Sequence, residues 1–155
     1  MVYEAESGDL TVVASGDTMI TRRLSVFREP QFVSLVELFR QADVGYTNLE
    51  MLMHEYEHSP GMAGGTFTAS DPRNIEDLQW AGINIVSTAN NHSYDYGEGG
   101  VAENLKNLRS AGLVHAGTGS NLSEARAPAY LDTAKGRVAL ISASSTFHEA
   151  GRALD

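Results

Sequence analysis

Two adjacent carboxamides, an imidazole and a carboxylate lie close together in the stretch 87–100, S-T-A-N-N-H-S-Y-D-Y-G-E-G-G. These groups belong to Asn90, Asn91, His92 and Asp95. A carboxamide oxygen can ligate a divalent cation, and an imidazole can give a proton to a leaving group. A second interpretation is structural, because asparagines make turn hydrogen bonds and an aspartate caps a helix. For this stretch alone both interpretations stay open.

Short apolar runs alternate with helical patterns along the chain, which is typical of parallel α/β folds. The runs cover residues 10–14, 44–47, 83–86 and 113–116. Helical patterns follow Pro30, follow Ser70-Asp71-Pro72 and begin near Gly100, with Gly82 and Gly112 as stops. Two further runs, 129–131 and 138–142, flank Thr133–Gly136 and predict an antiparallel hairpin. The expected fold is α/β, a βαβαβαβ unit plus a β-hairpin, in one domain spanning 1–155.

Polar groups follow the first three apolar runs. Asp17 comes after the first run, Asn48 and Glu50 after the second, and Asn91 and His92 after the third. The carboxyl ends of neighbouring parallel strands meet at one edge of the sheet when the crossovers are right-handed. We therefore expect these side chains to converge. Each residue alone is a plausible helix cap, but together they favour a site.

The convergent groups offer oxygen and imidazole donors, and the chain has no cysteine. Such donors suit one or two divalent ions such as Mn, Zn, Fe or Mg. A bound ion lowers the pKa of its water and polarises the bond under attack, while a free imidazole protonates the leaving group. The predicted reaction class is hydrolysis.

Two loops supply further candidates. Residues 51–69 lack a clear period and predict a long surface loop that covers a substrate. It contains His54 and His58, four residues apart, but no helical apolar face, so neither is placed in the metal site. The loop 117–121 is rich in small residues and could offer amides to an anion, which makes Thr118 a candidate substrate contact.

Composition narrows the partners. The chain has 155 residues, 42% of them hydrophobic, and a formal net charge of −9, which disfavours binding to nucleic acid or anionic lipid. The start has no secretory-signal pattern, and there is no run of 18 apolar residues, so no membrane segment is expected. The chain as written looks cytoplasmic. An extracellular or cell-surface domain whose leader was removed would look the same.

Several short motifs together resemble the CapA (PgsA) family, named for capsule and poly-γ-glutamate synthesis. They are Gly16-Asp17-Thr18-Met19, Asn48-Leu49-Glu50, Ala89-Asn90-Asn91-His92, Asp95-Tyr96-Gly97 and Gly100. The family is related to the calcineurin-like metallophosphatases. The resemblance implies an α/β/β/α sandwich of two sheets with a two-metal site at the strand ends, of which this chain looks like the N-terminal half.

The resemblance also implies a role for individual residues. Asp17 would be a first-site metal ligand, Glu50 would bridge the metals and Asn91 would be a second-site ligand. His92 would be the leaving-group acid, and Asp95 would orient His92 or shape the loop. Apart from the resemblance, we expect substrate contacts from Asn48, Asn90, Thr118 and His148; the resemblance itself assigns no role to His148. Metallophosphatases usually carry a histidine where this chain has Met19, a poor ligand for such ions, so one metal position is weakened.

Two functions fit these residues. The first is a metal-dependent hydrolase acting on a phosphoester, ester or amide bond in a small molecule or polymer. The second is a non-catalytic component that binds an anionic polymer in capsular polyglutamate assembly. The later histidine motifs of the family lie beyond residue 155. We therefore expect either a missing C-terminal half or a site completed by a homo-oligomer.

Overall fold

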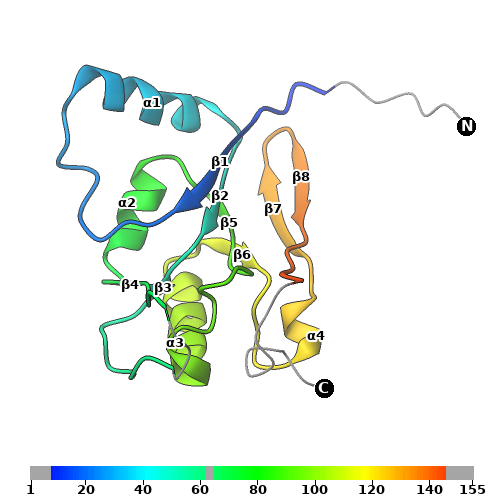
Figure 1. Ribbon diagram of the computed structural model, residues 1–155. Coiled ribbons are helices and arrows are strands. Elements are labelled where there is room, and N and C mark those ends of the chain that lie inside the picture. The colour runs from blue at the N-terminus through cyan, green and yellow to red at the C-terminus, as the bar shows by residue number, and fades with distance from the viewer. Residues whose placement is uncertain (1–7, 62–64, 146–155) are drawn as a thin grey trace, which may run out of the picture.

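A parallel sheet of four strands, in the order β1-β2-β5-β6, forms the centre of the molecule (Figure 1). The computed structural model describes residues 8–61 and 65–145. The strands are β1 (Val12–Thr18), β2 (Val44–Leu49), β5 (Ile85–Ser87) and β6 (Val114–Ala116). Each new strand is added at the same edge, and all pairs are parallel. The predicted βαβαβαβ order is confirmed and fits the α/β half of a metallophosphatase-like sandwich.

Three helices lie in the connections between these strands: α1 (Pro30–Gln41), α2 (Asn74–Trp80) and α3 (Gly97–Ser110). The short α4 (Leu122–Ala125) follows β6. Pro30 suits the first turn of α1 because its missing N–H would be unpaired there in any case. Gly82 ends the α2 segment with φ +94°, a conformation that side chains other than glycine rarely adopt. No described helix has both the length and the apolarity needed to cross a membrane.

The main core lies between the sheet and the helices. Leu49 of β2 and Val86 of β5 pack in one cluster with Leu78 of α2 and Leu108 of α3. All four side chains are essentially removed from solvent, and each such burial contributes about 1.5–3 kcal/mol. The spacing of Phe32, Leu35, Val36 and Phe39 predicts that they share one helix face packed on the sheet. Leu35 is instead 54% exposed. Helix α1 therefore covers the sheet through fewer residues than expected.

The predicted hairpin forms from β7 (Ala129–Thr133) and β8 (Gly136–Leu140). It stays a separate two-stranded sheet rather than extending the parallel one. An apolar groove of about 200 Å³ lies between the hairpin and the sheet. The groove is lined by Val12, Val44, Tyr46, Ile85, Val138, Ala139 and Leu140. The hairpin thus faces the side of the sheet opposite the main core (Figure 1).

The segment 51–69 is more ordered at its ends than a plain loop. Strand β3 (Leu52–Met53) pairs in parallel with β4 (Ala69–Ser70). Asn104 of α3, itself buried, accepts a hydrogen bond from the Met53 N–H at 2.9 Å. The expectation of one long loop is therefore wrong at both ends, because two-residue strands are too short to produce a period in the sequence.

Candidate functional site

The strand-end residues meet at the carboxyl edge of the sheet. Asp17 lies in β1 directly opposite Asn48 of β2, because the pairing register shifts by one residue between Ala14 and Asp17. The side-chain amide of Asn48 donates to Asp17 Oδ1 at 2.8 Å. Glu50 follows β2 immediately. The first two strand ends therefore present two carboxyl groups and a carboxamide side by side.

The turn after β5 joins this group through Asn90. Its Nδ2 donates to Asn48 Oδ1 at 3.1 Å and to the Leu49 carbonyl at 2.9 Å. Its Oδ1 accepts from the His92 N–H at 3.1 Å. Asn90 is buried. It therefore fixes the turn against β2 with both ends of its carboxamide, and few of its polar atoms remain to face a substrate.

His92 is held between two carboxyl groups. Its Nδ1 lies 2.8 Å from Asp95 Oδ2, and its Nε2 lies 3.9 Å from Glu50 Oε1. The side chains of His92 and Asp95 are only 15% and 11% exposed. With Nδ1 bonded to Asp95, Nε2 is the ring atom that points toward Glu50. This is the arrangement of an oriented proton donor or acceptor.

Thr68, which the sequence analysis did not single out, holds Asp95 in place. Its N–H donates to Asp95 Oδ2 at 2.6 Å, and its hydroxyl donates to the Glu50 carbonyl at 3.0 Å. Thr68 directly precedes β4. A lone threonine in an aperiodic stretch gave no signal, because its role depends on the pairing of β3 with β4.

Glu50 is the electrostatically unusual group of the site. It is 8% exposed, and its Oε2 has no hydrogen-bond partner among the described residues. Burial raises the pKa of the Glu50 carboxyl, and the adjacent Asp17 carboxyl raises it further, while the charge of His92 opposes the rise. The pKa of Asp17 is lowered, first by the Asn48 amide and then by Glu50. Two carboxyl groups thus compete for one proton, an arrangement that a bound cation would relieve.

The donor set fits a divalent ion in kind, with carboxylates, a carboxamide oxygen and an imidazole. It does not form a closed ligand cage, since the ligand atoms of Asp17, Glu50 and His92 do not all lie within 4.8 Å of one another. Asn91, predicted as a ligand, is exposed at the same turn. Met19, two residues after Asp17, is 50% exposed. Its thioether adds no hard donor.

Thr118 and His148 stand apart from this group. The Thr118 hydroxyl is 2.8 Å from the Thr88 hydroxyl, which places Thr118 beside the end of β5. Among the described residues, Thr118 forms no hydrogen bond with Asp17, Glu50 or His92. His148 lies outside the described residues.

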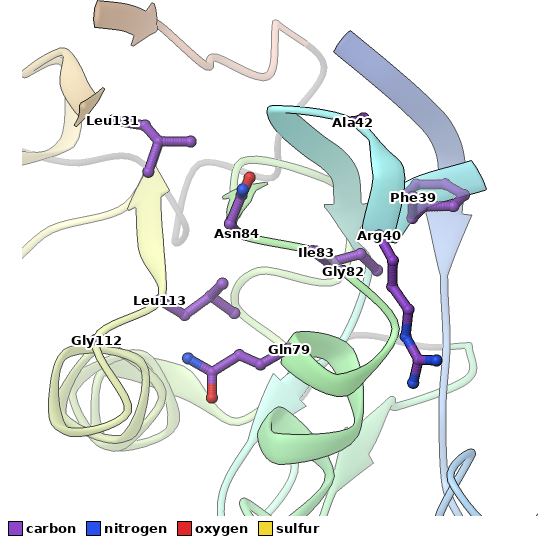
Figure 2. Close-up of a pocket in the computed structure, with 10 residues that line it drawn as sticks. All are labelled: Phe39, Arg40, Ala42, Gln79, Gly82, Ile83, Asn84, Gly112, Leu113 and Leu131. Atoms are coloured by element: carbon purple, nitrogen blue, oxygen red, sulfur yellow. The ribbon is translucent and has the colours of Figure 1, made fainter. Parts of the chain in front are cut away.

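A pocket in the structure lies away from these residues. It measures about 440 Å³ and is lined by Phe39, Arg40, Ala42, Gln79, Gly82, Ile83, Asn84, Gly112, Leu113 and Leu131 (Figure 2). Two of its polar side chains already have backbone partners: Arg40 Nε donates to the Trp80 carbonyl and Gln79 Nε2 to the Ala111 carbonyl, both at 2.8 Å. Ile83 and Asn84 precede β5, so the pocket lies at the amino end of that strand. We place the candidate site at the opposite, carboxyl end because the titratable groups gather there.

The chain is similar to proteins of a known bacterial family. The family described as "Bacterial capsule synthesis protein PGA_cap" matches residues 11–154. Two proteins of Sinorhizobium fredii (strain NBRC 101917 / NGR234), y4sH and y4uA, both described as uncharacterized, are 40% identical over 149 residues. "Capsule biosynthesis protein CapA" of Bacillus anthracis is 24% identical over 155 residues.

These matches cover 94% of this chain but 32% of each Sinorhizobium protein and 37% of the Bacillus protein. The chain therefore spans about a third of the length of the curated relatives it matches. The match across 11–154 confirms the resemblance that the motifs around Asp17, Glu50 and His92 predicted. This chain belongs to the bacterial capsule synthesis protein PGA_cap family.

Proposed function

We propose that the carboxyl edge of the sheet is a metal-dependent hydrolytic site that acts on a phosphoester, ester or amide bond. The observation that carries the proposal is Glu50, which lies between Asp17 and the Asp95-oriented imidazole of His92. Its carboxylate is nearly buried, and one of its oxygens has no hydrogen-bond partner in the part of the chain that the structure describes. A nearly buried carboxylate beside a second, exposed carboxyl group is unfavourable without a cation. The capsule-synthesis family supports a role in making or processing an anionic polymer.

Asp17 and Glu50 would hold the cation, with Asn91 as a further oxygen donor on the exposed side. A divalent ion there supplies an activated water and polarises the bond under attack. His92 keeps Nδ1 bonded to Asp95, so its Nε2 is the atom that exchanges a proton with the leaving group. Thr68 and Asn90 position the two ends of this turn through the bonds described above.

The test is hydrolysis of p-nitrophenyl phosphate and p-nitrophenyl acetate by the protein in the presence of Mn²⁺ or Zn²⁺. His92→Asn is expected to lower the rate by about 10²–10⁴-fold, the usual contribution of a positioned general acid. His115→Asn is the matched control, because His115 lies in β6 and its Nδ1 bonds to the Leu113 carbonyl. Equal rates for both variants, or no rate in the wild type with either ion, would refute the proposal.

A second function is supported by Met19, whose position lacks a hard ligand, and by the capsule-related family name. In this alternative the same edge binds an anionic polymer without cleaving it. Because the chain carries a net charge of −9, a polyanion would bind only through bridging cations. Poly-γ-glutamate binding that requires added divalent ion, with no product formed, would favour this alternative over hydrolysis. Absence of binding with and without the ion would remove it.

A further inference from the structure

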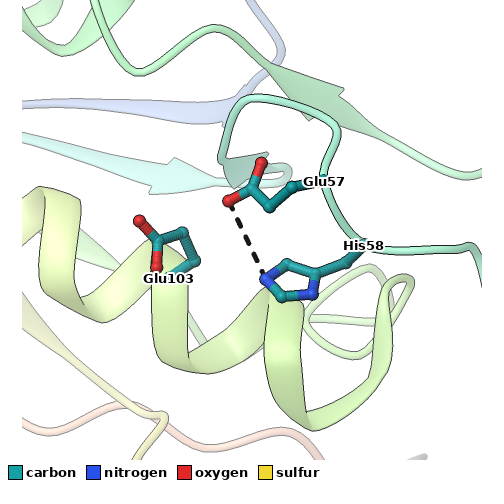
Figure 3. Close-up of side chains that lie close together, drawn as sticks. All are labelled: Glu57, His58 and Glu103. Carbon is teal, nitrogen blue, oxygen red and sulfur yellow. Dashed lines mark ion pairs between the residues drawn. The ribbon is translucent and has the colours of Figure 1, made fainter.

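A second group of metal-binding side chains lies between the segment after β3 and helix α3. It consists of Glu57, His58 and Glu103, whose ligand atoms all lie within 4.8 Å of one another (Figure 3). His58 Nε2 is 3.8 Å from Glu57 Oε1. Among the described residues, these are the three histidine or acidic side chains whose ligand atoms lie this close together. None of the three belongs to the candidate hydrolytic site.

The fold holds these side chains together from both sides. The ring of His58 lies against the backbone of α3 at Gly99, where an added Cβ would come within 2.6 Å of His58 Nδ1. Glycine at this position therefore leaves room for the ring. Glu103 projects from the same helix one turn later. The segment is tied at its other end because the Gly61 N–H donates to the Asp95 carbonyl at 2.7 Å.

The local charges leave a place for a cation. Glu57 and Glu103 are both acidic, and the near cation is Lys106, whose Nζ is 2.7 Å from Glu103 Oε1 and whose side chain is 67% exposed. A surface pair of this kind contributes little and can be displaced. The side chains of Glu57, His58 and Glu103 are 40%, 32% and 26% exposed, so an ion can reach them from solvent.

A buried imidazole, that of His54, lies next to the group. His54 is fully buried, and its Nδ1 lies 3.6 Å from Glu57 Oε2. Its Nδ1 accepts from the Tyr56 N–H at 3.1 Å, and its Nε2 has no hydrogen-bond partner among the described residues.

We propose that Glu57, His58 and Glu103 bind a borderline divalent cation such as Zn²⁺, with water completing its coordination. One imidazole and two carboxylates form a mixed nitrogen and oxygen set of the kind that Zn²⁺ accepts. The bound ion joins the segment 54–61 to α3 and so fastens the chain that leads to Thr68 and Asp95. This site is separate from Asp17 and Glu50 and does not depend on the hydrolytic proposal.

The experiment uses Zn²⁺ alone as the probe and removes the other candidate site first. In an Asp17→Asn/Glu50→Gln background, isothermal titration is expected to show one Zn²⁺ per chain. Adding His58→Ala or Glu103→Gln is expected to weaken that binding by at least about tenfold, the scale seen when metal-site contacts are removed. Adding His115→Ala is the matched control and should leave it unchanged. Lys106→Gln should tighten it, because a competing cation is lost.

Two results would overturn the proposal. One is the absence of Zn²⁺ binding in the double-variant background. The other is binding that His58→Ala and Glu103→Gln leave unchanged while both variants keep the wild-type circular dichroism spectrum. If the hydrolytic proposal is wrong, the protein shows no hydrolytic activity but still binds this one Zn²⁺ per chain. The two proposals can therefore fail independently.

Discussion

Replacing Glu50 by glutamine should stabilise the metal-free protein at neutral pH, although it alters a proposed metal ligand. The wild-type carboxylate is nearly buried next to the like charge of Asp17, and one of its oxygens has no partner within residues 8–61 and 65–145. Leaving a buried polar group unpaired costs about 1–3 kcal/mol. An amide of the same shape removes the charge and can donate to Asp17. We expect Glu50→Gln to raise the free energy of unfolding by about 1–3 kcal/mol at pH 7.5.

The sign of the pH dependence follows from the raised pKa of Glu50. The folded state binds this proton more tightly than the unfolded state, whose glutamate has a pKa of about 4.3. The wild type therefore loses stability as the pH rises above about 4.3 and through the higher folded pKa. Below about pH 4 the Glu50 carboxyl is largely protonated in both the folded and the unfolded state. The advantage of Glu50→Gln should then disappear.

Urea unfolding followed by tryptophan fluorescence measures this difference. The chain has one tryptophan, Trp80, which stacks on Phe32 with ring centroids 6.4 Å apart and reports on the helix side of the sheet. With a slope of about 2 kcal/mol per molar urea, the midpoint should rise by about 0.5–1.5 M in EDTA at pH 7.5. Glu55→Gln, an exposed carboxylate, is the control and should shift stability by less than about 0.5 kcal/mol.

Added divalent ion should reverse the order of stability of the wild type and Glu50→Gln. Mn²⁺ that binds only the folded state raises the midpoint of the wild type, but it should have little effect on Glu50→Gln at this site. A Glu50→Gln variant that is less stable than the wild type at pH 7.5 in EDTA would refute the reasoning. Glu50 would then be a structural partner rather than a strained carboxylate.

Three further outcomes concern the fold. Gly45→Ala should destabilise by about 1–3 kcal/mol in urea unfolding, because the added methyl would clash with the backbone of the turn before β5. Asn104→Ala should cost about 1–3 kcal/mol by thermal unfolding, since it leaves the buried Met53 N–H without its partner. Hydrogen bonds with Thr11 help to lower the pKa of the Asp43 carboxyl to about 2. Asp43→Asn should therefore lower the urea midpoint at pH 7. That difference should shrink as the pH falls from about 4 through 2.

The order of elements could be predicted from the sequence because each signal was local. Pro30 marked the start of α1, Gly82 marked the end of α2, and short apolar runs marked the strands. The first and last residues of the elements were harder to predict than their order. Strand β1 runs to Thr18 rather than ending at Ala14, because its last residues gain their partners from β2. The four-residue α4 is too short to give a helical period.

The convergence of Asp17, Glu50 and His92 could be predicted because parallel strands share a carboxyl edge. What could not be predicted were the contacts that depend on distant segments meeting. The hydrogen bonds of Thr68 to Asp95 and the approach of His58 to Glu103 join residues 27 and 45 positions apart along the numbered chain. The local hydrophobic pattern of the sequence carries no information about such pairs. The roles of Asn91 and His148 remain predictions.

The shifted register between Ala14 and Asp17 has a consequence for how the strand can vary. Uninterrupted pairing from Ala14 opposite Tyr46 would bring Asp17 opposite Leu49 instead of Asn48. Since side chains alternate between the two sides of a strand, the carboxylate would then point into the apolar interior. The extra residue in β1 thus decides which side of the sheet the Asp17 side chain faces. Deleting one residue between Ala14 and Asp17 would turn that side chain to the opposite side without changing any site residue.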